Sequence, residues 1–172
     1  MKVIFLFFPF LFLTACEREA PQPPDPLDLL PPATQTGENT LGFLLDGEPW
    51  LPNRIFQGDY RKSDGRFNIQ TRNEKYDENG NPIGSTFSIG SINTSLLNEG
   101  DYQITEYGNL SAGIYFLVGC YYVSFSDEPG LLDITRLDTF VRIISGTFHC
   151  KVISEDCTDT LNITHGRFDV SF

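Results

Sequence analysis

Apolar and polar residues alternate along most of the chain from residue 41 onward, and this pattern constrains the fold more than any other feature. In the stretch 66–70 apolar residues alternate with polar ones, and Phe148, Cys150 and Val152 share one face of a later stretch. Because successive side chains of a strand point to opposite faces, this pattern predicts β-strands with one buried and one solvated face.

Turn signals separate these stretches at short intervals. Asn79-Gly80 is the strongest hairpin signal in the chain. The stretch 113–125 is apolar on both faces and predicts a central strand, or a pair of strands broken at Gly119. We find no amphipathic helical stretch of useful length. We therefore predict an all-β fold over 40–172, a single antiparallel β-sandwich or barrel-like domain of about nine or ten strands.

The predicted strands cover most of this domain. They are residues 41–45, 54–62, 66–72, 83–92, 101–106, 113–125, 131–136, 139–153 and 158–172, with a strand ending near residue 75 and a bulge at His165-Gly166. In the final hairpin, which turns near residues 154–156, the strand period predicts one buried face. Its members are Phe148, Val152, Leu161, Ile163, Phe168 and Val170.

The N-terminus has the layout of a secretory signal peptide. Lys2 precedes the apolar segment 3–13, which is broken only by Pro9 and is well short of the ~20 residues that a membrane span needs. Leu-Thr-Ala then precedes Cys16, and this resembles a bacterial lipobox. The resemblance implies loss of residues 1–15 as a lipoprotein signal peptide and lipidation of Cys16. An ordinary signal peptide or a short membrane helix is the alternative.

Residues 16–39 make up a predicted linker that begins with the lipidated cysteine. The segment is rich in proline and has few residues to bury. Proline-rich chain is extended and semi-rigid at ~3.1 Å per residue, so we expect a disordered tether with a reach of roughly 60 Å. Leu27, Leu29 and Leu30 can form a short turn, but no helix is expected between these prolines.

The chain is strongly acidic, with 12 Lys+Arg against 23 Asp+Glu and a net charge of −11. This charge argues against nucleic acid as a partner and against electrostatic attachment to anionic lipid, because both need a basic surface. The predicted membrane link is therefore the N-terminal lipid itself. The acidity is explained by solubility alone or by an acidic binding site.

Lipidation of Cys16 leaves three of the four cysteines for other chemistry. An oxidising compartment permits one intramolecular disulfide. Cys150 and Cys157 lie on either side of one turn, so we expect them to pair and Cys120 to stay free and buried; buried free thiols are the alternative. Zinc binding by His149, Cys150 and Cys157 is disfavoured, because His149 and Cys150 point to opposite faces of a strand.

Several strand and turn motifs stand out: Asn-Thr-Leu-Gly-Phe at 39–43, Asp-Gly-Glu-Pro-Trp at 46–50, Leu-Leu-Asp-Ile-Thr-Arg-Leu-Asp-Thr at 131–139, Ile-Ser-Gly-Thr-Phe at 144–148 and Ile-Thr-His-Gly-Arg-Phe-Asp-Val at 163–170. Together they resemble a family of small Bacteroidetes lipoproteins of unknown function. The resemblance covers most of 41–172, but its motifs are strands, turns and core aromatic residues. It implies an all-β lipoprotein domain and transfers no catalytic residue.

Residue types that carry chemistry are sparse. The two histidines, His149 and His165, are accompanied by no Gly-x-Ser-x-Gly nucleophile motif. The Asp-Glu-Asn-Gly-Asn run at 77–81 has the opening spacing of a calcium loop, but Pro82 replaces the glycine that such a loop needs, which favours a solvated hairpin tip. We predict no catalytic residue, metal site or cofactor.

Tyr115, Tyr121 and Tyr122 form a candidate aromatic binding surface for sugar or peptide, although aromatic residues in strands are more often core. We predict a lipid-anchored, non-enzymatic binding or structural module of the cell envelope, on the periplasmic or surface-exposed face of the outer membrane, with an envelope protein or glycan as partner. The alternatives are a glycan- or peptide-binding accessory of a larger envelope complex, and a hydrolase. A binding protein predicts an exposed aromatic patch, and an enzyme predicts a cleft with a perturbed titrating group.

Overall fold

The computed structural model describes residues 23–55, 58–91, 98–105, 110–116, 119–124, 127–154 and 156–172. These residues form one short 3-10 helix and twelve antiparallel strands in one sheet, which confirms the all-β prediction. The elements are η1 (Pro26–Leu29), β1 (Thr40–Leu45), β2 (Glu48–Trp50), β3 (Arg54–Ile55), β4 (Asp59–Arg61), β5 (Arg66–Asn73), β6 (Ser85–Ser91), β7 (Gly100–Ile104), β8 (Leu110–Phe116), β9 (Tyr121–Ser124), β10 (Gly130–Asp138), β11 (Ile143–Ser154) and β12 (Asp159–Ser171).

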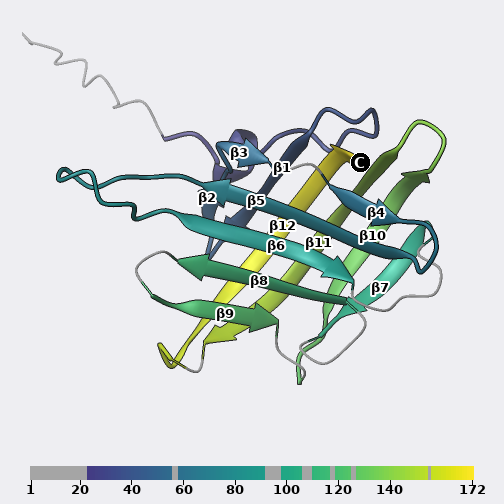
Figure 1. The fold of residues 1–172 in the computed structure, drawn as a ribbon. Helices are drawn as coiled ribbons and strands as arrows, with labels where there is room; N and C mark the ends of the chain where they lie inside the picture. Colours follow the sequence, from purple (N-terminus) through teal and green to yellow (C-terminus); the bar gives the residue numbers. More distant parts are fainter. Residues whose placement is uncertain are drawn as a thin grey trace, which may run out of the picture.

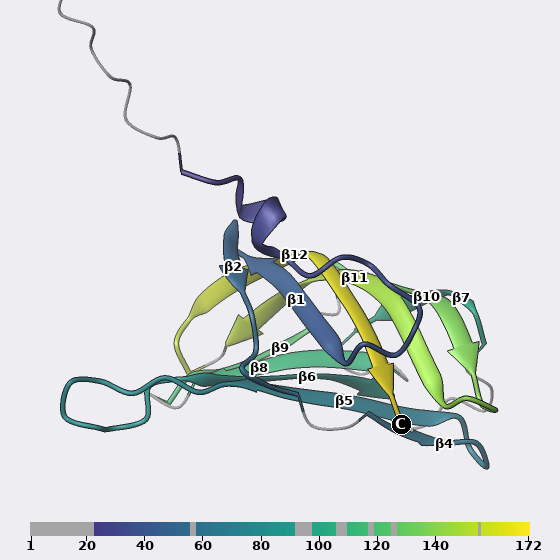
Figure 2. The same cartoon turned by 90° about the horizontal axis from the view of Figure 1, so that it is seen from above.

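The sheet folds over into two facing layers (Figures 1 and 2). One layer contains β1, β12, β11, β10 and β7, and the other contains β9, β8, β6, β5 and β4. The two layers join where the end of β11 pairs with β9, at Val152–Ser124 and Ile153–Val123. The sheet is not closed into a barrel, so the structure has the sandwich-like form of the two predicted architectures.

Aromatic side chains fill the space between the layers. Phe43 stacks on Trp50 with ring centroids 4.7 Å apart, and Phe87 stacks on Phe148 at 5.4 Å. The Trp50 indole donates a hydrogen bond of 2.8 Å to the Ser85 hydroxyl, which satisfies its buried N–H. Burial of each such side chain contributes roughly 1.5–3 kcal/mol to stability. These rings hold β1 and β11 against β6.

The final hairpin, β11–β12, buries the predicted face. Phe148, Val152, Ile163, Phe168 and Val170 are buried, and Leu161 is partly buried against the same core. The predicted bulge is also confirmed, because Phe148 pairs with Gly166 while Cys150 pairs with Ile163. The extra residue lies on β12, where His165 has a φ of 53°. Gly166 must be glycine, because a Cβ there would lie 2.6 Å from the Phe148 ring.

Other strand predictions are confirmed in outline and corrected in detail. The stretch 113–125 forms the pair β8 and β9, broken at Gly119, whose φ is 111°. The stretch 54–62 contains two short strands, β3 and β4, and β2 was not predicted at all. Several predicted strand ends, such as residues 92, 106 and 125, lie outside the described residues. Among the residues that the structure describes, no helix has the length and hydropathy needed to cross a membrane.

The segment before β1 packs on the domain, so the predicted disordered linker is wrong for residues 30–39. This segment begins after η1, runs along the β1–β12 layer and leaves Leu30 only 7% exposed (Figure 2). Its Pro31 covers Gly42 of β1 so closely that a Cβ at Gly42 would lie 2.7 Å from the proline ring. The fixed φ of proline gives extended chain, and extended chain can lie along a sheet as readily as in solvent.

Asp169 of β12 holds this segment in place. The side chain is 0% exposed, and its carboxylate accepts hydrogen bonds from Thr34 Oγ1 (2.7 Å), Thr36 N (2.9 Å), Gly37 N (2.8 Å), Glu38 N (3.1 Å) and Ser145 Oγ (2.6 Å). Burial by itself raises the pKa of a carboxyl group, but the hydrogen bonds outweigh it and lower the pKa of Asp169 to about 2. A charged carboxylate is therefore an integral part of the fold.

Candidate functional site

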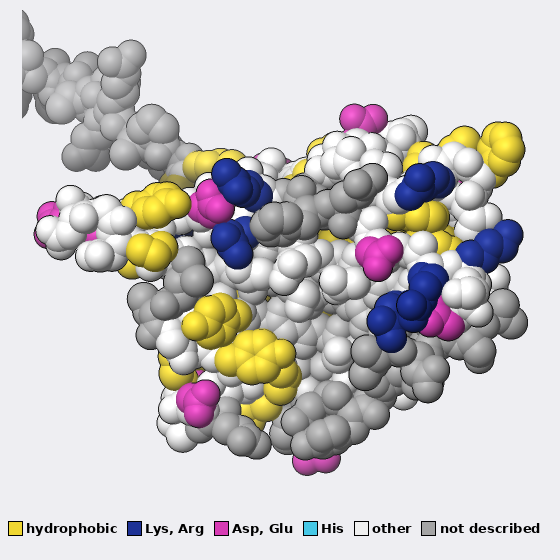
Figure 3. All heavy atoms as spheres, viewed as in Figure 1, with side chains coloured by type: hydrophobic (Ala, Val, Ile, Leu, Met, Phe, Trp, Pro, Cys, Tyr) yellow, Lys and Arg dark blue, Asp and Glu magenta, His cyan; other side chains and the backbone are white. Residues whose placement is uncertain are grey.

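Tyr115 of β8 and Tyr121 of β9 form an exposed aromatic pair on the second layer. They are cross-strand partners, and their ring centroids lie 6.4 Å apart with the rings inclined by 53°. Tyr115 is 41% exposed and Tyr121 is 52% exposed. Figure 3 shows apolar side chains gathered over β8 and β9, the two strands that carry this pair. Such a pair stabilises its hairpin and still leaves ring surface open to solvent.

Gly113 determines how the Tyr121 ring lies. A Cβ at Gly113 would be 3.4 Å from Tyr121 Oη and 3.7 Å from its Cε2. The end of the Tyr121 ring therefore reaches over the glycine, where there is no side chain to displace it. Both rings of the pair leave aromatic surface open to solvent.

Polar side chains continue from the tyrosines across the layer. A shallow depression of about 400 Å³ is lined by Gln70, Arg72, Thr86, Ser88, Gly113, Tyr115 and Tyr121, which we call the tyrosine face. An adjoining depression of about 330 Å³ shares Ser88 and extends to Arg66, Asn68 and Ser111. Within the tyrosine face, Arg72 Nε donates to Thr86 Oγ1 at 3.4 Å. Hydrogen-bond donors and acceptors thus lie side by side with an aromatic surface.

Tyr122 does not belong to this surface, which corrects the prediction that grouped it with Tyr115 and Tyr121. It is 5% exposed and packs edge-on against Phe116, with ring centroids 5.7 Å apart. Burial, with smaller contributions from nearby carboxylates, raises the pKa of its hydroxyl. The reason is the strand period itself, because neighbouring residues of β9 must point to opposite faces.

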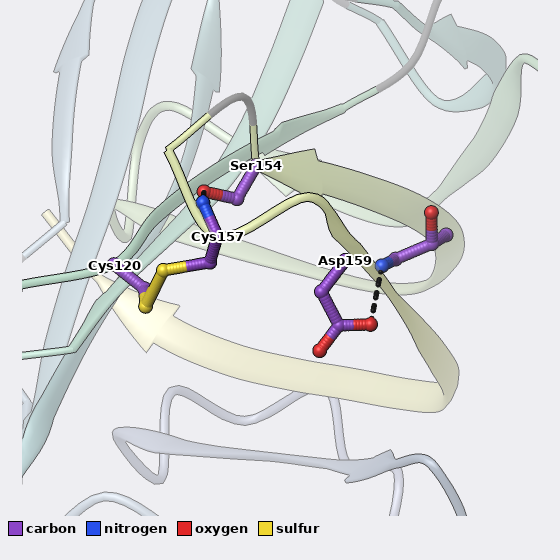
Figure 4. The surroundings of a disulfide bond; sticks show 5 residues. Cys120, Ser154, Cys157 and Asp159 are labelled. Atoms are coloured by element: carbon purple, nitrogen blue, oxygen red, sulfur yellow. Dashed lines mark hydrogen bonds between the residues drawn. A yellow bond between two sulfur atoms is a disulfide. The ribbon is translucent and has the colours of Figure 1, made fainter.

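The disulfide joins Cys120 to Cys157, so the predicted Cys150–Cys157 pairing is wrong. The Cα atoms of the bonded cysteines are 6.0 Å apart (Figure 4). Cys150 is free and buried, because the strand register places it opposite Ile163 of β12 and turns its side chain into the core. Burial raises the pKa of the Cys150 thiol to about 12. Cys157 lies in the turn before β12, where it bonds to Cys120.

This disulfide supports the tyrosine face. Cys120 immediately precedes Tyr121, so the bond ties the start of β9 to the turn between β11 and β12. The turn is itself held by a hydrogen bond of 3.2 Å from the Cys157 N–H to Ser154 Oγ (Figure 4). A strand of four residues thereby gains a covalent connection beside its exposed tyrosine.

The predicted histidine–cysteine pair and the predicted hairpin tip lie among the described residues, whereas the lipidation site does not. His149 is exposed and Cys150 is buried, which confirms that they point to opposite faces. In the run 77–81, the Asp77 carboxylate accepts hydrogen bonds from Asn79 N and from Asn81 N and Nδ2, so it closes the turn of the hairpin. Cys16 lies outside the described residues, and its lipidation stays a prediction.

The alternation of polar and apolar residues already placed Gln70, Thr86 and Ser88 on solvent-facing positions of their strands. It did not show that they would join Tyr115 and Tyr121, because that depends on the pairing order β5–β6–β8–β9. The signal that identifies this face therefore has two parts. Strands with polar residues at every second position must pair with a strand whose solvent-facing residues are aromatic. No family model, curated protein or solved structure matches the chain.

Proposed function

We propose that the protein is a non-enzymatic glycan-binding module of the cell envelope, held to a membrane by lipid on Cys16. The observation that carries this proposal is the exposed Tyr115–Tyr121 pair, set in a polar sheet face with the end of the Tyr121 ring over Gly113. The apolar C–H face of a sugar ring packs on the electron-rich face of an aromatic ring. Exposed aromatic residues of this kind are a feature of binding surfaces.

The neighbouring side chains favour a glycan over a peptide. Gln70, Thr86 and Ser88 supply amide and hydroxyl groups that both donate and accept hydrogen bonds, as the hydroxyl groups of a sugar do. A peptide that binds by adding a strand to the sheet would instead need an unpaired strand edge. The tyrosine face lies across the paired strands β5, β6, β8 and β9, whose backbone groups already bond to one another.

The titrating groups support a role in binding. Among the described residues, the carboxylates whose pKa is lowered are occupied in maintaining the fold. Besides Asp169, they are Asp64, Asp77 and Asp138. The chief cause of the lowered pKa is a hydrogen bond from the Arg61 side chain for Asp64 and from the Asn81 side chain for Asp77. For Asp138 it is a hydrogen bond from the Val141 backbone N–H. Asp64, Asp77 and Asp138 each lie in or beside a turn, and none of the four carboxylates lines the tyrosine face.

The envelope location rests on the N-terminal sequence. The lipobox resemblance at Cys16, the apolar segment before it and the resemblance of the strand motifs to small Bacteroidetes lipoproteins support the proposal of an anchored protein beyond the inner membrane. The Cys120–Cys157 disulfide supports the same location, because disulfides form and persist in oxidising compartments.

Affinity electrophoresis through gels that contain neutral polysaccharides tests the proposed function. We expect at least one polysaccharide to retard the protein, and the double variant Tyr115→Ala, Tyr121→Ala to lose that retardation. The matched control is Tyr76→Ala, which removes a 63% exposed tyrosine from the hairpin between β5 and β6. Loss of the cross-strand pair should cost under about 1 kcal/mol, so the variant stays folded. Equal retardation of the double variant and the parent would refute a role for these rings, and no retardation by any polysaccharide would refute the glycan.

A further inference from the structure

The two histidines of the chain line one groove on the outer face of the β1–β12–β11–β10 layer. His149 comes from β11 and His165 from the bulge of β12. The groove has a volume of about 500 Å³, and Arg167, Thr147 and Thr164 complete its polar lining. An adjoining pocket of about 210 Å³ shares His149 and Thr164 and adds Lys151. The outer face of this layer points away from the layer of β5, β6 and β8, so the groove is separate from the tyrosine face.

The bulge brings these side chains together. Thr147 pairs with Arg167, and Phe148 pairs with Gly166, after which β12 carries one residue more than β11. His149 therefore lies opposite the bulge. A bulge bends its strand and redirects a side chain, and bulges are frequent beside binding sites. Here the redirected side chain is that of His165, which lines the groove and has a φ of 53°.

The groove differs in charge from the rest of the molecule. The chain has 23 Asp+Glu, yet none of the described residues that line the groove is a carboxylate. Arg167 Nε donates to the carbonyl of His165 at 3.5 Å, a long contact that leaves guanidinium donors for a ligand. The strand register places one carboxylate close by, that of Asp133, opposite Thr147 on β10. Lys151, in the adjoining pocket, is paired with Glu128.

We infer that this groove binds an oxyanion, a carboxylate or a phosphate group, carried by a ligand about the size of a monosaccharide. A guanidinium group binds such an anion through two parallel hydrogen bonds, and imidazole N–H and threonine O–H groups supply further donors. The volume lies within the range of small-molecule sites. Glycine adopts a positive φ more readily than histidine, so the backbone at residue 165 does not itself call for a histidine. The His165 side chain is therefore not required by the backbone, and we assign its imidazole to ligand binding in the groove that it lines.

An NMR titration of the histidine side chains in the full-length protein tests this site. The probes are inorganic phosphate and D-glucuronate at constant ionic strength, which distinguish phosphate from carboxylate, and glucose is the neutral control. We expect one of the two anions to shift the signals of His149 and His165 together and to saturate, while glucose shifts neither. Absence of a saturable shift with both anions would overturn the inference.

Two variants sharpen the test. Arg167→Gln should weaken anion binding at least tenfold, whereas Lys62→Gln, which removes the same charge from an exposed turn before β5, should leave it unchanged. His165→Gly should also weaken binding at least tenfold and should remain folded, because glycine suits the backbone at this position. Equal affinity in Arg167→Gln and the parent, or an equal loss in Lys62→Gln, would show that no specific site exists here.

Discussion

Replacing Asp169 by asparagine should remove the charge that holds residues 34–38 against β12. The buried carboxylate accepts hydrogen bonds from the backbone N–H groups of Thr36, Gly37 and Glu38 as well as from two hydroxyl groups. The side-chain amide of asparagine keeps one oxygen but presents two donors of its own. Some backbone N–H groups of the segment would then face another donor, and each buried group left without a partner costs about 1–3 kcal/mol.

The lowered pKa gives the magnitude and the pH range. The pKa of Asp169 is about 2 in the folded protein, against an ordinary value of 3.8. A tenfold change in proton affinity equals about 1.36 kcal/mol, so ionised Asp169 contributes about 2 kcal/mol to the free energy of unfolding. Because the folded protein holds the proton more weakly than the unfolded chain, this contribution is complete well above pH 4. It is lost as the pH falls from about 4 to 2.

Urea unfolding followed by the fluorescence of Trp50, the single tryptophan, measures this effect. We expect Asp169→Asn to lower the free energy of unfolding by at least about 2 kcal/mol at pH 6, and this difference to shrink by more than half at pH 2.5. Asp101→Asn, which removes an exposed carboxylate from β7, is the matched control and should cost little at either pH. A difference between Asp169→Asn and the parent that is the same at both pH values would refute the charged anchor.

Three further predictions concern the core, the disulfide and the anchor. Phe148→Ala should lower the free energy of unfolding by about 3–5 kcal/mol, because this ring packs on three other aromatic rings; a loss under 1 kcal/mol in urea unfolding would contradict that packing. Peptide mapping without reduction should find Cys120 joined to Cys157, and Cys150 should react with alkylating reagents only after unfolding; a link to Cys150 would contradict the structure. Cys16→Ser should release the protein from the membrane fraction, and unchanged retention would disprove the lipid anchor.

The alternation of apolar and polar residues predicted the strands well, because the residues of each strand themselves show which of its faces is buried. The alternating residues of β5 and β6 were placed within a few positions, and so were the buried face of β11–β12 and the bulge at His165-Gly166. These features depend on a period of two and on turn residues that the sequence displays directly. Where a strand is very short and lies at an edge, as β2 does, too few residues alternate to give a signal.

The errors arose where the outcome depends on distant parts of the chain. Residues 30–39 were predicted to be a free linker. Their own sequence gives no sign that the carboxylate of Asp169, about 130 residues away in the chain, accepts hydrogen bonds from their N–H groups. The cysteine pairing depends on which hairpin tips meet, and proximity in sequence gave the wrong partner. The error at Tyr122 has a local cause. Neighbouring residues of a strand point to opposite faces, so Tyr121 and Tyr122 could not both belong to the predicted binding surface.

The docked segment also settles how the tyrosine face is presented if lipid on Cys16 anchors the protein, as we propose. Residues 30–39 lie on the outer side of the β1–β12 layer, whereas Tyr115 and Tyr121 lie on the outer side of the opposite layer (Figure 2). Docking of residues 30–39 shortens the predicted tether by about 30 Å at ~3.1 Å per residue, so the domain stays closer to the membrane than a free linker would allow. The chain enters the domain from the side facing away from the tyrosines. Under the proposed lipid anchor, short attachment on that side would direct the tyrosine face away from the membrane, where the proposed glycan ligand would meet both rings.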